Sequence, residues 1–280
     1  MYGCRVQLTA VIIKWRVEMK SFVVSMVLVV SILTFVVGTA SAGFGVRVLA
    51  GIDYIRYSDF NDYVSNLNEN VLPSWNVSDE MGKIHFVPEI GGEVLFSVIP
   101  MINFGVGAGM IMGKSNLNIS VGDGGLDYEH KIRVYPVTGT IYVKPSIPFL
   151  FVKPYAFAGG GIYFSKLSFT ERVTSGSNED GYTSDLTKSG YGVHGGIGVE
   201  FAVAPKVSIN VEARGRIASI KGFTGTATSL DGEEMDVYLA NYKDSYGNPI
   251  YGPESVDEVH PEGALDLSGY GFMVALKIFL

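Results

Sequence analysis

The chain has 280 residues, of which 47% are hydrophobic, only 18% are charged and 35 are glycine. This composition is apolar for a soluble protein, and frequent glycine together with 12% aromatic residues favours a β architecture over a helical bundle. The formal net charge of −7 disfavours a nucleic acid partner, and a single cysteine rules out a scaffold held by internal disulfides. We expect a mostly β protein with almost no helix in its folded part.

The first predicted element is a secretory signal, MKSFVVSMVLVVSILTFVVGTASA, at residues 19–42. It combines a lysine, a long apolar run and a small-residue ending at Ala40–Ala42, which together are typical of a cleavable signal peptide. A transmembrane anchor is the alternative, because the run approaches the ~20 residues that span a bilayer. The small-residue ending favours cleavage after Ala42, with the residues before Met19 as an upstream extension. Cleavage leaves 17 basic and 27 acidic residues and removes Cys4.

From Gly43 onward the hydrophobic pattern has a period of two, which predicts β-strands with two different faces. In the first run, Val46 and Val48 share one face, while Arg47 and Leu49 share the other. In the fifth run the two faces are too similar to be oriented. Proline at 136 fits best at a strand irregularity. The eight runs are 44–57, 85–98, 103–113, 131–143, 154–167, 190–203, 206–219 and 266–280.

The connections between these runs alternate between long and short. The long ones are 58–83, 115–130, 169–188 and 222–266, and the short ones are turns that contain proline. This alternation predicts an up-and-down meander with one decorated end, because structureless loops of this length are uncommon inside compact domains. The 222–266 segment carries ten acidic residues, and Met235, Val237 and Leu239 alternate within it, so part of it is expected to form a projecting hairpin.

Glycine indicates which face of the strands points inward. Glycines 105, 107 and 109, and again 196 and 198, lie on the face that carries the charged residues. A row of glycine facing water would weaken a strand for no gain, whereas inside a narrow barrel it leaves room for long side chains. A polar interior is expected where lipid lies outside, and every run reaches the ~9–11 residues that a tilted strand needs to cross a bilayer.

We therefore predict an all-β fold, a closed antiparallel transmembrane barrel of about eight strands with short periplasmic turns and long extracellular loops. The predicted organisation is an extension plus signal peptide at 1–42 and a single barrel domain at 43–280. The predicted lumenal polar network comprises Arg47, Asp53, Glu89, Glu93, Arg133, His194, Glu200, Glu212, Arg214, Arg216 and Lys277. The predicted membrane-facing belt comprises Phe86, Phe96, Phe104, Tyr191, Phe201, Tyr270 and Phe272. A soluble lipocalin-like barrel, with the apolar face inward and an apolar ligand, is the alternative.

The chain from 43 to 280 resembles the small outer-membrane barrels of the OmpA, OmpW and opacity-protein superfamily. The resemblance rests on the signal ending ASA, the opening strand GFGVRVLAG, the segment KPYAFAGGGIYF at 153–164 and the apolar C-terminal strand. It implies an outer-membrane location and a final strand that is recognised by the barrel-insertion machinery. The aromatic residue expected at the end is penultimate here, at Phe279. The family also implies a pocket for small hydrophobic molecules just inside the extracellular end.

Three functions follow as hypotheses. The first is a non-enzymatic structural or surface barrel that contacts outer-membrane lipids and lipopolysaccharide, with binding or passage of small molecules left open. The second is a lipid-modifying enzyme, since His85 shares a face with Glu89, and His194 with Glu200. The third is the soluble ligand-binding barrel. No cofactor or metal is predicted, because glycine-rich GVGAG lacks a following helix and no ligand spacing resembles an EF-hand.

Overall fold

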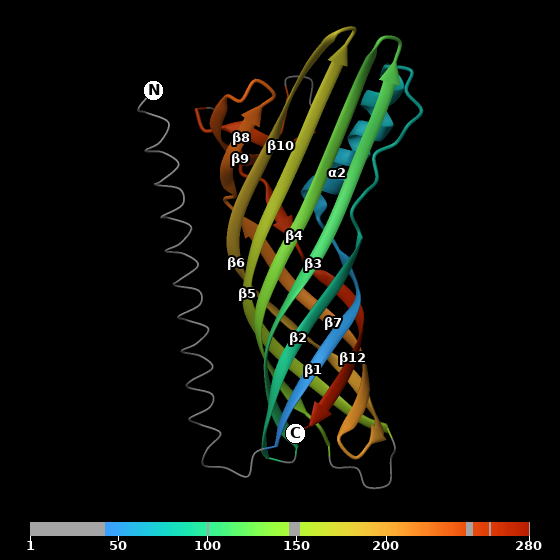
Figure 1. The fold of residues 1–280 in the computed structure, drawn as a ribbon, viewed down its shortest axis with the longest axis vertical. Helices are drawn as coiled ribbons and strands as arrows, with labels where there is room; N and C mark the ends of the chain where they lie inside the picture. The colour runs from blue at the N-terminus through green and yellow to red at the C-terminus, as the bar shows by residue number, and fades with distance from the viewer. Residues whose placement is uncertain (1–42, 100, 146–151, 245–248, 258, 280) are drawn as a thin grey trace. The chain divides into compact units, whose positions relative to one another are not determined.

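The computed structural model describes residues 43–99, 101–145, 152–244, 249–257 and 259–279 (Figure 1). The predicted signal peptide and upstream extension lie outside the described residues. The chain divides into two compact units, residues 1–43 and 44–280, and the following description concerns the second unit.

Strands dominate this unit. The ring-forming strands are β1 (Phe44–Ile55), β2 (Phe86–Ile99), β3 (Ile102–Val121), β4 (Gly124–Val143), β5 (Val152–Ser175), β6 (Asn178–Ala204), β7 (Val207–Lys221) and β12 (Gly269–Phe279). The remaining elements are α2 (Ser58–Asn66), η1 (Leu67–Val71), α3 (Leu72–Ser74), β8 (Thr224–Ser229), β9 (Glu234–Lys243), β10 (Pro249–Ser255) and β11 (Ala264–Asp266). Among the described residues, no helix is long and apolar enough to cross a membrane.

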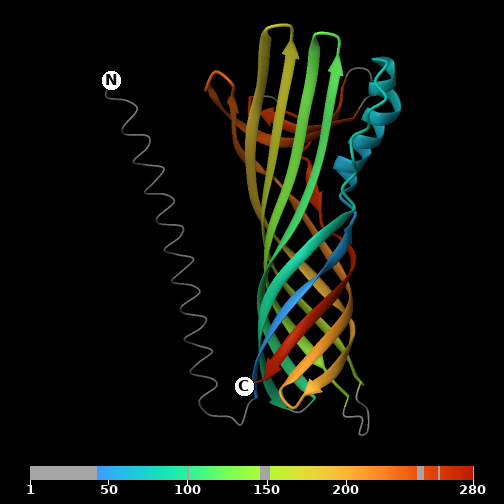
Figure 2. The same ribbon diagram turned by 45° about the vertical axis from the view of Figure 1, so that its right-hand side comes forward.

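The eight ring-forming strands close on themselves. Each of β1 to β6 pairs antiparallel with the next strand in sequence, and β12 pairs antiparallel with both β7 and β1 (Figure 2). Closure gives every strand two neighbours, so the ring has no open edge. The predicted up-and-down barrel is confirmed, and each of the eight alternating runs falls on one strand of the ring.

One ladder is interrupted at a proline. The β3–β4 pairing is in register on both sides of a gap where Gly109 and Met110 face Tyr135 and Pro136. Proline has no N–H to donate to a ladder, so the gap follows directly from the sequence. The irregularity predicted at this residue is confirmed.

Two predicted long loops are wrong. Residues 115–130 and 169–188 continue β3–β4 and β5–β6 as long hairpins, closed by tight turns at which Gly122 and Gly176 adopt φ of 58° and 61°. Such left-handed backbone favours glycine. The extended strands still alternate, since Leu117 and Ile119 are buried while their polar neighbours are exposed. Their outer face is polar, unlike the belt of a membrane strand, and this composition resembles that of a loop.

Above one end of the ring these hairpins join the two remaining long connections in a structure that we call the cap, made of residues 56–85, 111–134, 163–188, 218–244, 249–257 and 259–267. Strands β8, β9 and β10 extend the sheet from the upper part of β6, and β11 pairs with the end of β7. The hairpin expected around Met235 to Leu239 is β8–β9. The segment after β1 forms α2, η1 and α3, so the cap holds the helix that the composition did not predict. Figures 1 and 2 show α2 beside the tall hairpins.

Candidate functional site: the barrel interior and its two boundaries

The outer face of the ring is a continuous apolar belt. Tyr191 is 80% exposed and Phe86 72%, and aliphatic residues such as Val48 and Ile217 are exposed between the aromatic ones. Of the predicted belt, Phe86, Phe104, Tyr191, Phe201, Tyr270 and Phe272 are exposed and Phe96 is partly exposed. So much exposed apolar surface far exceeds what a water-soluble monomer tolerates.

The inner face carries ionised groups in clusters. In the first cluster, Arg47 pairs with Glu93 at 3.0 Å and with Glu212, and donates a hydrogen bond of 2.6 Å to Tyr142. Tyr142 donates in turn to Glu93, and Tyr155 donates to Glu212 at 2.6 Å. Each of the two carboxylates therefore receives both the guanidinium and a tyrosine hydroxyl, and such partners offset part of the cost of burying the charge.

A second cluster lies nearer the cap. Arg214 contacts Glu89 at 2.5 Å and Asp53 at 3.2 Å, and Arg216 contacts Asp53 at 2.5 Å and also pairs with Glu89. Two guanidinium groups thus face two carboxylates from β1, β2 and β7, so the charges balance. Tyr163 covers the Arg216 guanidinium with its ring.

A third cluster lies toward the short-turn end. Glu200 accepts from Lys277 at 2.5 Å and pairs with Lys144. Lys277 is only 1% exposed, so the lysine in the apolar C-terminal strand points into the barrel. Sequence reasoning did not predict Lys144 as a lumenal residue, because it lies just after the end of β4 and its partner Glu200 is 56 residues away in the chain.

The remaining predicted lumenal residues divide. His194 lies inside the ring, where its Nε2 is 3.0 Å from the Thr140 hydroxyl. Arg133 was placed wrongly, because the structure exposes it on the outside of β4, between the buried Ile132 and Val134. At this height β4 has entered the cap, where the interior is apolar and the exterior is polar. The rule that charges point inward therefore reverses along a single strand.

Glycine makes room for the interior clusters. A Cβ on Gly105 would overlap the Glu93 carboxylate, and one on Gly198 would lie 2.5 Å from Cζ of Tyr155. Real Cβ atoms do not approach so closely, so larger residues at either position would displace a charged or hydrogen-bonded side chain. Between the first and second clusters a cavity of about 40 Å³ remains, lined by both clusters and by glycines of β2 and β3. It is polar and large enough to hold ordered water.

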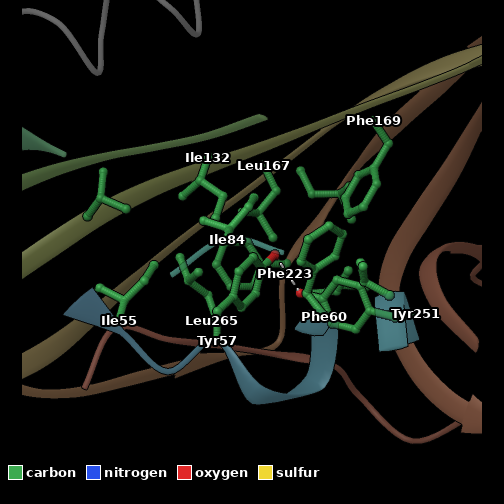
Figure 3. Packing of buried hydrophobic residues seen from close by; sticks show 14 of the residues in the cluster. Ile55, Tyr57, Phe60, Ile84, Ile132, Leu167, Phe169, Phe223, Tyr251 and Leu265 are labelled. Carbon is green, nitrogen blue, oxygen red and sulfur yellow. Dashed lines mark hydrogen bonds between the residues drawn. The ribbon is translucent and has the colours of Figure 1, made fainter. Parts of the chain in front are cut away.

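The cap has a hydrophobic core of its own, which closes the lumen at that end. Figure 3 shows the rings of Tyr57, Phe60, Phe169 and Tyr251 packed together with aliphatic residues from the ring and the cap. His130 is fully buried among them, with Nε2 2.7 Å from the Tyr57 hydroxyl and its ring stacked on Phe169. Burial lowers the pKa of His130 to about 3. The cap core therefore holds a neutral histidine at physiological pH.

Acid is expected to loosen the cap through His130. The unfolded cap takes up a proton below pH 6.5 whereas the folded cap does so only near pH 3, so stability present above pH 6.5 is lost as the pH falls. By pH 4.5 the loss is roughly 3 kcal/mol, at 1.36 kcal/mol per pH unit. This loss of stability is measured by comparing the protection of the cap amides against hydrogen exchange at pH 7 and at pH 4.5.

The control for this prediction is a pair of phenylalanine substitutions. His130→Phe should abolish most of the pH dependence, whereas His85→Phe, at a partly exposed histidine stacked on Tyr54, should retain it. Equal pH dependence in wild type and His130→Phe would contradict the assignment. Tyr57 keeps a hydroxyl partner in the variant, since its oxygen lies 2.9 Å from that of Tyr251.

A closed ring with lipid-like surface outside and ion pairs inside is a transmembrane β-barrel of the outer-membrane type. No protein-family model matches the chain, and no curated protein matches it. Among solved structures it is similar to a major outer membrane protein of Thermus thermophilus, at 10% identity and TM-score 0.44 over 86% of this chain and 100% of that one. It is also similar to OprG of Pseudomonas aeruginosa, at 9% identity and TM-score 0.42 over 85% and 96%. Neisserial surface protein A matches at 14% identity and TM-score 0.34 over 85% and 99%.

Proposed function

We propose that this protein is a structural and surface barrel of the bacterial outer membrane, which displays the cap outside the cell. The observation that carries the proposal is the inside-out ring, with apolar side chains on the lipid side and three charge clusters in the lumen. Outer-membrane lipids surround the belt, and β12 serves as the strand that the insertion machinery recognises.

Solute passage is not part of the proposal, because buried ion pairs and the cap core fill the described lumen at several levels. The position just inside the extracellular end, where a pocket for hydrophobic molecules was expected, is occupied by the cap core. The enzymatic alternative gains no support either. His194 contacts Thr140, and His85 contacts Tyr54 and the Asn61 amide, rather than the carboxylates on their faces.

The orientation predicts which end is reachable from outside the cell. Ser177 lies exposed in the cap, at the β5–β6 turn, and Lys206 lies exposed at the β6–β7 turn of the opposite end. In a Cys4→Ser background, a membrane-impermeant maleimide should label Ser177→Cys on intact cells and Lys206→Cys only after permeabilisation. Both variants should sediment with the outer membrane and change gel mobility on boiling. Recovery in the soluble fraction, or labelling of Lys206→Cys on intact cells, would contradict the proposal.

A further inference from the structure

We propose that the outer face of β3–β5 just above the belt binds the phosphorylated headgroup of an outer-leaflet lipid, with Arg133 and Lys166 as the main contacts. This inference rests on the proposed membrane location. It begins with two unusual cross-strand pairs, Arg133 opposite Lys166 and Lys114 opposite Lys131. Like charges directly opposite each other destabilise a sheet, because the Cβ atoms of such a pair are only about 5 Å apart. In the described ring and cap, no other opposed pair on the outer face joins two cations.

Nearby carboxylates compensate these four cations only in part. Glu129 bridges Lys114 and Lys131, and Asp185 contacts Lys166 at 2.8 Å. Arg133 forms no salt bridge among the described residues, and the carboxylate on which its charge acts is Asp185, which Lys166 already contacts. Four cations against two carboxylates leave the patch with a charge of +2 on a chain whose formal net charge is −7. The patch is thus a local site for an anion.

The position of the patch just above the belt favours a lipid headgroup as the bound anion. Tyr135 and Phe164 are directly opposite each other two residues below Arg133 and Lys166, and they are 44% and 42% exposed on the same face. Aromatic residues of this kind mark the boundary between the apolar belt and the headgroups. A lipid whose acyl chains lie along the belt therefore brings its headgroup to the level of the patch.

The chemistry of the patch suits phosphate. A guanidinium group presents a planar fork of N–H donors that matches two phosphate oxygens, and a lysine ammonium adds a further charge-assisted hydrogen bond. Because Arg133 and Lys166 extend from adjacent strands on one face, a single phosphate group can contact both. A neutral headgroup would leave the repulsion within the pair uncompensated.

The test measures binding of diphosphorylated lipid A to the full chain recovered from membranes in detergent, by native mass spectrometry. Dephosphorylated lipid A with the same acyl chains is the matched ligand. The double variant Arg133→Gln, Lys166→Gln is compared with Lys83→Gln, Lys221→Gln, which removes two exposed cations of the same end elsewhere on the molecule. We expect the patch variant to lose roughly tenfold in affinity for the phosphorylated lipid, and the control variant to bind like wild type.

Three outcomes would overturn the inference. Equal binding by the patch and control variants excludes the patch, and equal binding of the two lipid forms excludes phosphate recognition. Full displacement of the lipid by millimolar inorganic phosphate would show a site for the free anion rather than for the lipid. Heat-dependent gel mobility of every variant is recorded in parallel. If the patch variant inserts normally and binds phosphorylated lipid A as tightly as wild type, this inference alone is refuted. If the wild-type chain is soluble, the proposed function is refuted.

Discussion

Replacing Arg47 by methionine is expected to lower the free energy of unfolding of the barrel by about 3–5 kcal/mol. Arg47 is the only cation that an ion pair of the described structure places on Glu93 and Glu212, and all three side chains are almost fully buried. Without Arg47, the carboxylates of Glu93 and Glu212 face each other inside the barrel with no cation between them. Breaking a buried pair from one side costs far more than the pair contributes, because the remaining charge stays desolvated.

The measurement is the urea midpoint of the folded band in lipid vesicles, read by gel mobility without boiling. Arg172→Met is the matched control, since it removes an exposed arginine from the β5–β6 hairpin of the same barrel, where its only salt bridge among the described residues is a long, exposed one with Glu179 at 3.9 Å, and it should change the free energy of unfolding by less than about 1 kcal/mol. Adding Glu93→Gln to Arg47→Met should recover part of the loss because one uncompensated charge disappears. A wild-type midpoint for Arg47→Met would show that water, rather than the guanidinium, stabilises these carboxylates.

The substitution Val274→Arg is expected to lower the free energy of unfolding by about 2–4 kcal/mol, which is the cost of placing an arginine side chain near the middle of a bilayer. Val274 is 55% exposed in the middle of β12, with Ala50 and Val211 opposite it on the neighbouring strands. The same substitution at Asn118, exposed on the outer face of β3 in the cap, should be close to neutral. Folding yield into lipid vesicles and the urea midpoint measure both effects.

This comparison also separates the transmembrane barrel from a soluble one. If water covered the ring, Val274→Arg would replace an exposed valine by a well-solvated cation and would cost little. If Val274→Arg and Asn118→Arg changed the free energy of unfolding equally little, the conclusion that lipid contacts the outer face of the ring would be contradicted. A graded cost, large at Val274 and absent at Asn118, would place the bilayer boundary between them.

The ring could be predicted because a membrane strand faces two contrasting solvents. Lipid outside and charge pairs inside give each residue of β1, β2 and β12 a clear preference, and register follows from parity. The fifth run was ambiguous because β5 carries aromatic residues on both faces. Tyr155 points inward to donate to Glu212, while Phe164 points outward, and residue type alone does not distinguish the two roles.

The cap could not be predicted by the same reasoning. Above the belt the exterior becomes water and the interior becomes apolar, so the inward residues of β4 change from polar to Ile132 and Val134 while Arg133 faces out. Nothing in the local pattern of residues 115–130 marks this change of solvent. The core that fills the cap also joins segments from opposite ends of the chain, and such contacts have no local signature in a single sequence.

Those long-range contacts have a consequence for the order of assembly. Tyr57 follows β1 and Tyr251 precedes β12, so their hydroxyl contact spans 194 residues of chain. The two segments come together where β1 and β12 pair, which is the seam that closes the ring. Contacts of such high sequence separation form late, because the entropy of closing the intervening chain must first be overcome. The cap core therefore holds together the segments next to β1 and β12, and it is complete only in molecules in which these two strands have paired.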